Sequence, residues 1–236
     1  TAVANHLLVR DPNAKVTLVG RNEARGQAAV AEVHEKHTNA NLLFLCESLD
    51  QNNCSSNSQT ADYTKNKRVL DQLLLNDVDC VIHTAGPYVD CQPLVLQAAI
   101  EARVPVYVDV SDPLPYLERG CLLSDSAKRS GTTAVLSAGA FPGMSNVLAV
   151  ETATEVMKLS GNERIGDVIF NYFTAGLGGS GNINLYITNV GFGEYMGVFD
   201  NGQLTFSPDL PGRLLGTVDF FLPHSRGFGN AEARER

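Results

Sequence analysis

Four short segments of the sequence contain residues whose side chains or backbone could take part in chemistry. Each lies at or just after the end of an apolar run: Gly20-Arg21-Asn22, Ala85-Gly86-Pro87, Asp109 and Pro142-Gly143. An arginine can bind a phosphate through its guanidinium, and a glycine lets backbone approach a ligand closely. A carboxylate can orient a substrate or accept a proton. The turn before a helix presents backbone N–H groups that favour an anion.

Each of these candidates has a structural alternative that the sequence leaves open. The alternative for Arg21 is an ordinary surface arginine, and for Ala85-Gly86-Pro87 it is a plain turn between a strand and a helix. Asp109 could simply bind backbone N–H groups, with Asp112 capping the helix that follows. For the fourth segment the alternative is a helix whose N-cap is Ser145, which is compatible with a ligand site.

Other residues with suitable chemistry are expected to be structural. His34 and His37 are three residues apart on a predicted helix, but a solvated face is favoured over a metal site because glutamates surround them. His83 lies inside an apolar strand and is expected to be a core histidine with its hydrogen bonds satisfied. Cys91 has no basic partner nearby in the sequence, so it is expected to be structural. No metal site is predicted.

The elements that position these candidates alternate between strand and helix. Strand patterns cover residues 15–19, 42–46, 79–84, 104–110 and 132–137. Helical patterns cover residues 1–10, 23–37, 67–75, 93–102, 115–130 and 145–159. Asn22 is the predicted N-cap of the helix at 23–37, and Gly131 is predicted to end the helix at 115–130. Such alternation indicates βαβ units, and short, continuously apolar strands indicate a sheet covered on both faces. We therefore predict an α/β fold with a Rossmann-type, doubly wound parallel sheet.

The N-terminal end of this pattern is unusual, because the first element is a helix. In a doubly wound sheet the first strand is central, between the second and fourth strands in chain order. Without it, buried backbone groups in the middle of the sheet would be unpaired. We therefore expect a strand and a glycine-rich turn to precede Thr1 in the full gene product, so that the first strand is missing from this chain.

The pattern changes after residue 160. Residues 168–174 alternate between apolar and polar, as half-buried strands do. Residues 198–206 contain Asn201-Gly202 between two strand-like segments, which predicts a hairpin with a type I′ turn. We predict a Rossmann-like domain at residues 1–150 and part of a mainly antiparallel α+β domain at residues 151–236.

Composition and charge argue against several classes of protein. The net charge of −8 over 236 residues argues against a nucleic-acid partner, because phosphate binding needs a basic surface. No apolar run reaches the roughly 18 residues of a transmembrane helix. The five cysteines contain no CxxC pair, which argues against a disulfide framework, a zinc site and secretion, and favours a reducing compartment.

The predicted fold suggests a role for Arg21. At the end of the second strand of a doubly wound sheet, an acidic residue binds the ribose 2′-hydroxyl of NAD, whereas an arginine accommodates the 2′-phosphate of NADP. Residues 20–22 contain Arg21 and no acid. If the chain binds a dinucleotide, NADP is therefore favoured over NAD.

Four motifs occur in order: VIHTAGPY at 81–88, VLQAAI at 95–100, YVDVS at 107–111 and SAGAFPGMSN at 137–146. In this order and spacing they resemble the saccharopine dehydrogenase-like family. Residues 171–181 (NYFTAGLGGSG) are similar to plant and algal plastid members. The resemblance covers residues 1–221. It implies a Rossmann domain that binds NADP or NAD, followed by a domain for substrate binding or dimerisation.

The resemblance also implies which residues meet the cofactor and what reaction follows. By position, the residues around the cofactor would be Arg21, Asn22, Ala85, Gly86, Pro87 and Asp109, with Pro142 and Gly143 near the nicotinamide. Family members oxidise or reduce carbon–nitrogen bonds of small molecules, and some reduce enoyl groups. NADP is the expected cofactor, but the family's glycine-rich fingerprint would stand just before Thr1 and is absent from this chain, so the alternative is that this chain by itself binds none. In saccharopine-forming members an acid precedes the later proline, whereas Phe141 does here, which argues against that activity.

These observations favour an NADP-dependent oxidoreductase with a small-molecule substrate that the sequence does not identify. Asp109 is the candidate for an acid or base. The alternative is a non-catalytic Rossmann-fold subunit or scaffold of a larger complex, and a third hypothesis is a nucleotide-sensing regulator. A homodimer fits the resemblance. The resemblance to plastid members implies a location in the chloroplast. If that resemblance is set aside, the expected location is the cytoplasm.

Overall fold

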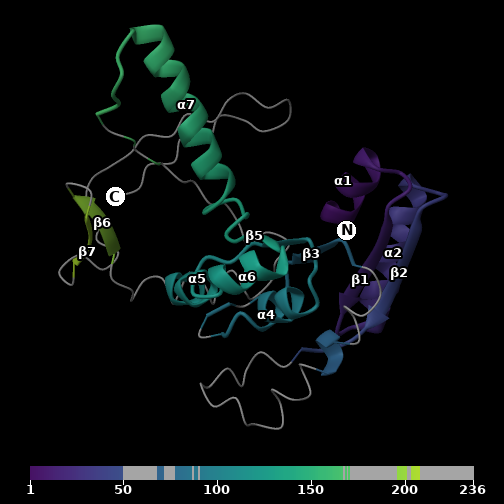
Figure 1. The fold of residues 1–236 in the computed structure, drawn as a ribbon. Helices are drawn as coiled ribbons and strands as arrows, with labels where there is room; N and C mark the ends of the chain where they lie inside the picture. Colours follow the sequence, from purple (N-terminus) through teal and green to yellow (C-terminus); the bar gives the residue numbers. More distant parts are fainter. Residues whose placement is uncertain are drawn as a thin grey trace, which may run out of the picture. The chain divides into compact units, whose positions relative to one another are not determined.

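The computed structural model describes residues 1–49, 68–71, 78–86, 88–89, 91–166, 168, 170, 196–200 and 203–207. The chain divides into two compact units, Thr1–Thr152 and Ala153–Arg236. Figure 1 shows the ribbon coloured from purple at the N-terminus to yellow. All four candidate segments belong to the first unit.

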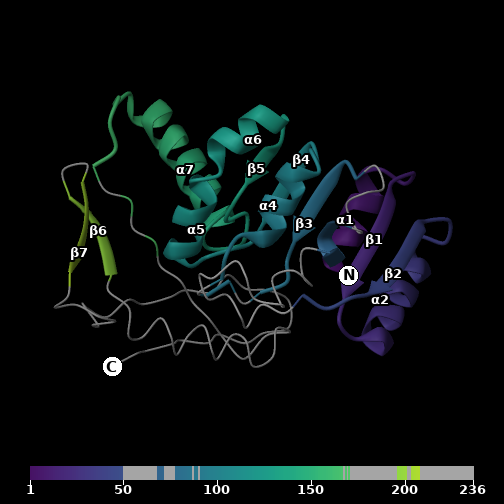
Figure 2. The same ribbon diagram turned by 60° about the horizontal axis from the view of Figure 1, so that its bottom comes forward.

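The first parallel sheet consists of β1 (Lys15–Gly20) and β2 (Asn41–Cys46). α1 (Ala2–Arg10) precedes β1, and α2 (Glu23–Lys36) connects the two strands. Figure 2 shows α2 alongside this pair of strands. The core cluster of these elements contains Ala4, Leu8, Val33 and Leu42. Gly26 allows α2 to approach β2 closely, because a Cβ at this position would overlap the Phe44 ring.

The second parallel sheet has the order β3-β4-β5, formed by Cys80–His83, Val106–Asp109 and Thr133–Val135. α4 (Leu94–Glu101) connects β3 to β4, and α5 (Leu114–Cys121) and α6 (Ser124–Ser130) connect β4 to β5. Leu96, Ala99, Val104, Tyr107 and Ala127 are buried together in its core. Side chains of α4 and α6 therefore pack in one core with β4.

Parallel strands connected by helices confirm the predicted α/β fold class. In the described part of the chain, β1 and β3 are not hydrogen-bonded to each other. The predicted strands thus form a two-stranded and a three-stranded sheet. Residues 68–71 are helical, as predicted, and Leu70 belongs to the core cluster around α4.

One predicted helix is wrong in its extent. Residues 115–130 form two helices, α5 and α6, with a turn at Leu122 and Leu123 between them. α5 buries Tyr116 and Gly120, and α6 buries Ala127. At the junction Leu123 N donates to Gly120 O at 3.0 Å, so a tight turn with an i→i−3 bond replaces the continuous helical ladder. Gly131 ends α6 in the left-handed conformation, as predicted for a C-terminal glycine.

Beyond the second sheet, the described chain contains one helix and one hairpin. α7 (Met144–Ser160) follows the 137–143 loop. β6 (Met196–Asp200) and β7 (Gln203–Ser207) pair antiparallel, which confirms the predicted hairpin, while its turn at residues 201–202 lies outside the described residues. Residues 168 and 170 are described without strand structure, and the rest of the predicted strand at 168–174 lies outside the described residues. Among the helices described, none has the length and apolar character to cross a membrane.

Candidate functional site

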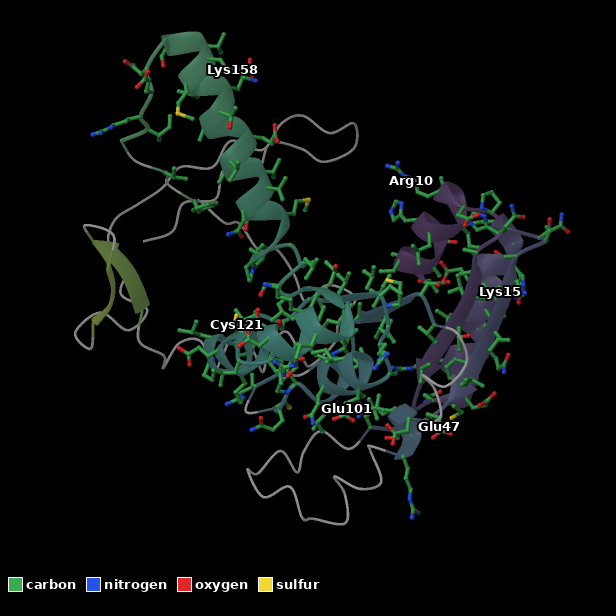
Figure 3. All side chains as sticks on the ribbon, in the orientation of Figure 1. Arg10, Lys15, Glu47, Glu101, Cys121 and Lys158 are labelled. Atoms are coloured by element: carbon green, nitrogen blue, oxygen red, sulfur yellow. The ribbon has the colours of Figure 1, made fainter. Side chains whose placement is uncertain are left out.

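The strands β3, β4 and β5 are parallel, so their carboxyl ends lie at the same edge of the sheet. His83, the last residue of β3, pairs with Asp109, the last residue of β4. The Ala85-Gly86 turn follows β3, and the 137–143 loop follows β5. Figure 3 labels Glu101 and Cys121 at the ends of α4 and α5, the helices on either side of β4 in the chain.

Asp109 is fully buried at this edge, with 0% of its surface exposed. Its Oδ1 accepts hydrogen bonds from Ser111 N at 3.1 Å, Ser111 Oγ at 2.6 Å and Ser137 N at 3.0 Å. Tyr107 Oη donates to Oδ2 at 3.1 Å. The structural alternative for Asp109, a bond to backbone N–H groups, is thus confirmed. Because Ser137 follows β5, the carboxylate connects the loops that follow β4 and β5.

A group of aromatic side chains extends this network. Tyr107 Oη lies 3.1 Å from Nδ1 of His83 and 3.4 Å from Tyr116 Oη. Tyr88 Oη donates to the carbonyl oxygen of His83 at 2.7 Å. The Tyr88 ring meets the His83 and Tyr116 rings edge-on, with ring centroids 5.1 Å apart in both pairs. The network therefore connects β3, β4, α5 and the segment after β3.

The expectation for His83 is half right. The side chain is buried, as predicted, but its Nε2 has no hydrogen-bond partner among the described residues. The two nearest phenols do not reach that nitrogen, since Tyr107 pairs with Nδ1 and Tyr88 pairs with the backbone carbonyl.

Burial controls the ionisation of this network. Burial raises the pKa of Tyr107, Tyr88 and Tyr116 far above the usual value for a phenol, so all three stay protonated at neutral pH. Burial lowers the pKa of His83 below its usual 6.5, and this outweighs the opposite effects of the Asp109 carboxylate and of the Ala85 backbone. The neutral imidazole and neutral phenols therefore surround one carboxylate.

The 137–143 loop has a constrained backbone. Ser137 has a φ of +59° and Gly143 a φ of +128°, both in the region that favours glycine. A Cβ on Gly143 would also overlap the backbone of Gly139, so a glycine is required there on two grounds. The backbone conformation of this loop between β5 and α7 therefore tolerates few substitutions at Gly143.

Two predicted helix caps are wrong. α7 begins at Met144, so Ser145 lies inside the helix, and Asn146 instead accepts a hydrogen bond from Gly143 N at 3.1 Å. This bond from the third helical residue back to the preceding residue is half of a capping box. Asp112 does not cap α5, because the helix begins at Leu114 and its N-cap is therefore Pro113, which makes no side-chain bond.

Arg21 and Asn22 follow β1 in the other sheet. Asn22 is the N-cap of α2, as predicted, and its side chain accepts a hydrogen bond from Arg25 N at 2.9 Å. Arg21 is exposed, and no hydrogen bond or ion pair joins its side chain to another described residue. Its guanidinium, beside the first turn of α2, is available to a phosphate.

The structure thus places the candidates in two groups. Ala85, Gly86, Asp109 and the loop with Pro142 and Gly143 lie in or after the strands of one sheet, whereas Arg21 and Asn22 follow β1 of the other. Pro87 lies outside the described residues. Within the described residues, no cluster of three or more His, Cys, Asp or Glu side chains could hold a metal ion.

Sequence reasoning missed the partners of Asp109. Tyr107, Asp109 and Ser111 alternate along the β4 segment, and this period of two places their side chains on one face of the strand. That spacing was the available signal for a polar cluster inside an apolar strand. Tyr88 and Tyr116 had no such signal, because they reach the cluster from a loop and a helix.

Comparison with known families gives one match. A family model described as the saccharopine dehydrogenase NADP binding domain matches residues 1–135, which is more than half of the 236 residues. The matched segment contains Arg21, the Ala85-Gly86 turn and Asp109. No curated protein matches the chain.

Proposed function

We propose that this chain, which belongs to the saccharopine dehydrogenase NADP-binding domain family, binds NADP and provides the nucleotide-binding part of an NADP-dependent oxidoreductase that acts on a small molecule. The observation behind this proposal is Arg21, an exposed arginine directly after β1, where no acidic residue stands. At this position of the fold an arginine accommodates the 2′-phosphate that distinguishes NADP from NAD.

The local geometry around Arg21 fits that group. β1 ends at Gly20 and α2 begins at Glu23, so Arg21 lies in a two-residue turn before a 14-residue helix. A carboxylate at residue 21 would repel the phosphate, whereas a guanidinium attracts it and can bind two of its oxygens. The exposure of Arg21 lets it reach a bound nucleotide without first breaking another contact.

The second sheet fits the other half of a dinucleotide. Dinucleotides bind across the carboxyl ends of the strands, with one half of the sheet for each nucleotide. The turn at Ala85-Gly86 and the 137–143 loop are the segments of this sheet that would border the nicotinamide half. When bound, NADP supplies the hydride chemistry, while the chain supplies binding and orientation.

A thermal-unfolding experiment on the full-length gene product tests the proposal, with NADPH and NADH as separate ligands. At about 100-fold excess over Kd, a ligand stabilises the folded state by roughly 2.7 kcal/mol. We expect NADPH to raise Tm, NADH to raise it less, and Arg21→Glu to remove most of the difference. Arg129→Glu is the matched control, because Arg129 is an exposed arginine on α6 whose side chain donates a hydrogen bond to Ser126 of the same helix.

The outcomes separate the two classes of function. A response to NADPH that Arg21→Glu abolishes and Arg129→Glu preserves supports the cofactor site. No response to either nucleotide would count against the oxidoreductase proposal and favour a non-catalytic subunit. Equal responses to NADPH and NADH would refute the role of Arg21 while leaving a dinucleotide site in place.

A further inference from the structure

The hydrogen bonds around Asp109 have a direction that follows from counting protons. Two backbone N–H groups, those of Ser111 and Ser137, necessarily donate to Oδ1. The Ser111 hydroxyl donates to the same oxygen at 2.6 Å, a length typical of a bond to an ionised carboxylate. A carboxylate only accepts, so the remaining neighbour, Tyr107, must donate its single proton to Oδ2.

This assignment fixes the direction of the next hydrogen bond, between Tyr107 and His83. With its proton committed to Asp109, the Tyr107 oxygen can only accept from its two other neighbours. One of them is Tyr116 Oη at 3.4 Å, and the other is Nδ1 of His83 at 3.1 Å. Nδ1 must therefore have the proton of the neutral imidazole ring.

The other ring nitrogen agrees with this tautomer. With Nδ1 protonated, Nε2 of a neutral His83 has a lone pair and no proton. Nε2 is buried and has no hydrogen-bond partner among the described residues. A buried N–H donor without a partner is rarer in proteins than an acceptor without one, so an unprotonated Nε2 fits this position better than a protonated one.

We propose that Asp109 is a positioning residue. Its buried carboxylate orients a hydrogen-bond chain through Tyr107 and so keeps His83 in the Nδ1–H tautomer, while the same carboxylate holds the loops after β4 and β5 in place. Asp109 then acts through its neighbours, because its side chain is fully buried and four donors already occupy its oxygens. The consequence for cofactor affinity rests on the proposed function, whereas the tautomer of His83 does not.

Asp109→Asn gives a sharp test, because the two carboxyl oxygens have unequal partners. Oδ1 accepts three hydrogen bonds, so the amide oxygen must take its place and the NH2 group must face Tyr107. Tyr107 then has to accept from the amide and turn its own proton toward His83. The result is an inverted chain in which Nδ1 of His83 accepts and Nε2 has the proton.

The measurement is the tautomer of His83, read from the 15N shifts of its ring nitrogens by NMR on the full chain at neutral pH. We expect Nδ1–H in the native chain, Nε2–H in Asp109→Asn, and Nδ1–H in the matched control Asp112→Asn, whose carboxyl group lies three residues further along. Tyr107→Phe is a second variant that keeps the carboxylate and removes the link. It should abolish the preference for Nδ1–H.

The second readout is NADPH affinity, which we expect to fall about tenfold in Asp109→Asn, as loss of a hydrogen-bonded charge typically causes. An Nε2–H tautomer in the native chain would overturn the proposal, even if every variant failed to fold. Retention of Nδ1–H in folded Asp109→Asn would overturn it as well, and unchanged NADPH affinity in that variant would refute the positioning of the loops. If the native chain bound no NADPH, the proposed function would fail, but the tautomer inversion would still establish the oriented chain.

Discussion

Removal of the Tyr107 hydroxyl should destabilise the protein more than removal of any neighbouring phenol. In Tyr107→Phe the ring remains and one oxygen atom is lost. That oxygen has hydrogen bonds to Asp109 and His83, each 3.1 Å long, and a longer one of 3.4 Å to Tyr116. Asp109 Oδ2 and His83 Nδ1 are then left inside the protein without these partners.

The magnitude follows from what each partner loses. An unsatisfied buried neutral group costs about 1–3 kcal/mol, and an unsatisfied charged group costs more. With one neutral and one charged group affected, we expect Tyr107→Phe to lower the free energy of unfolding by about 3–5 kcal/mol. For a chain of this size that corresponds to a fall in Tm of roughly 6–20 °C.

The two other phenols provide matched controls, because each also loses one buried hydroxyl. Tyr88→Phe removes one bond of 2.7 Å to the His83 carbonyl, so we expect a loss of about 1–2 kcal/mol. Tyr116→Phe removes only the 3.4 Å contact, so we expect less than about 1 kcal/mol.

Urea unfolding followed by circular dichroism, with Tm as a second measure, gives the ranking directly. The reasoning predicts the order Tyr107, then Tyr88, then Tyr116. If Tyr116→Phe cost as much as Tyr107→Phe, the effect would come from general loss of packing, and the central role of the Tyr107 hydroxyl would be refuted.

Three further predictions concern pH and backbone. Because burial lowers the folded-state pKa of His83 below 6.5, its contribution to stability is complete above about pH 6.5 and is lost as the pH falls toward the folded-state pKa. Between about pH 7.5 and 5.5, the free energy of unfolding should therefore fall less in His83→Gln than in the native chain. Gly131→Ala should cost about 1 kcal/mol, through its φ of +79° alone. Gly143→Ala should cost more than about 2 kcal/mol, because the new Cβ would also overlap the backbone of Gly139. Equal values of Tm for the two variants would contradict this reasoning. Asn22→Ala should cost about 1 kcal/mol, since Arg25 N loses its capping acceptor, and Asn22→Asp should restore most of the stability.

Local chemistry allowed the elements of the first unit to be predicted from the sequence. Continuous apolar runs indicated β1 to β5, and Asn22 and Gly131 marked the start of α2 and the end of α6 because capping depends on nearest neighbours. The errors at Ser145 and Asp112 also concern caps. In both cases the helix starts at another residue than predicted, α7 at Met144 and α5 directly after Pro113, and the order of residues alone does not fix where a helix starts.

The residues of the candidate site also divide into those that the sequence predicts and those that only packing brings together. Arg21 could be located from the sequence, because its position directly after a strand predicts where it lies in this fold and suggests the proposed contact with NADP. The partners of Asp109 could not, because Tyr116 and Ser137 are 7 and 28 residues away from it in sequence and reach its network only when α5 and the loop after β5 pack against β4. Hydrogen bonds between distant residues depend on distances of about 3 Å that only packing sets.

The sequence by itself therefore determined the fold class, the family and the position of Arg21, the arginine proposed to bind NADP, since these depend on local patterns along the chain. Only the tertiary structure decided that Asp109 is buried beneath four donors and that one nitrogen of His83 has no partner in the described structure. The parallel register of β3 and β4 places His83 beside Asp109 although they are 26 residues apart, and the loop after β5 brings Ser137 N to the same carboxylate.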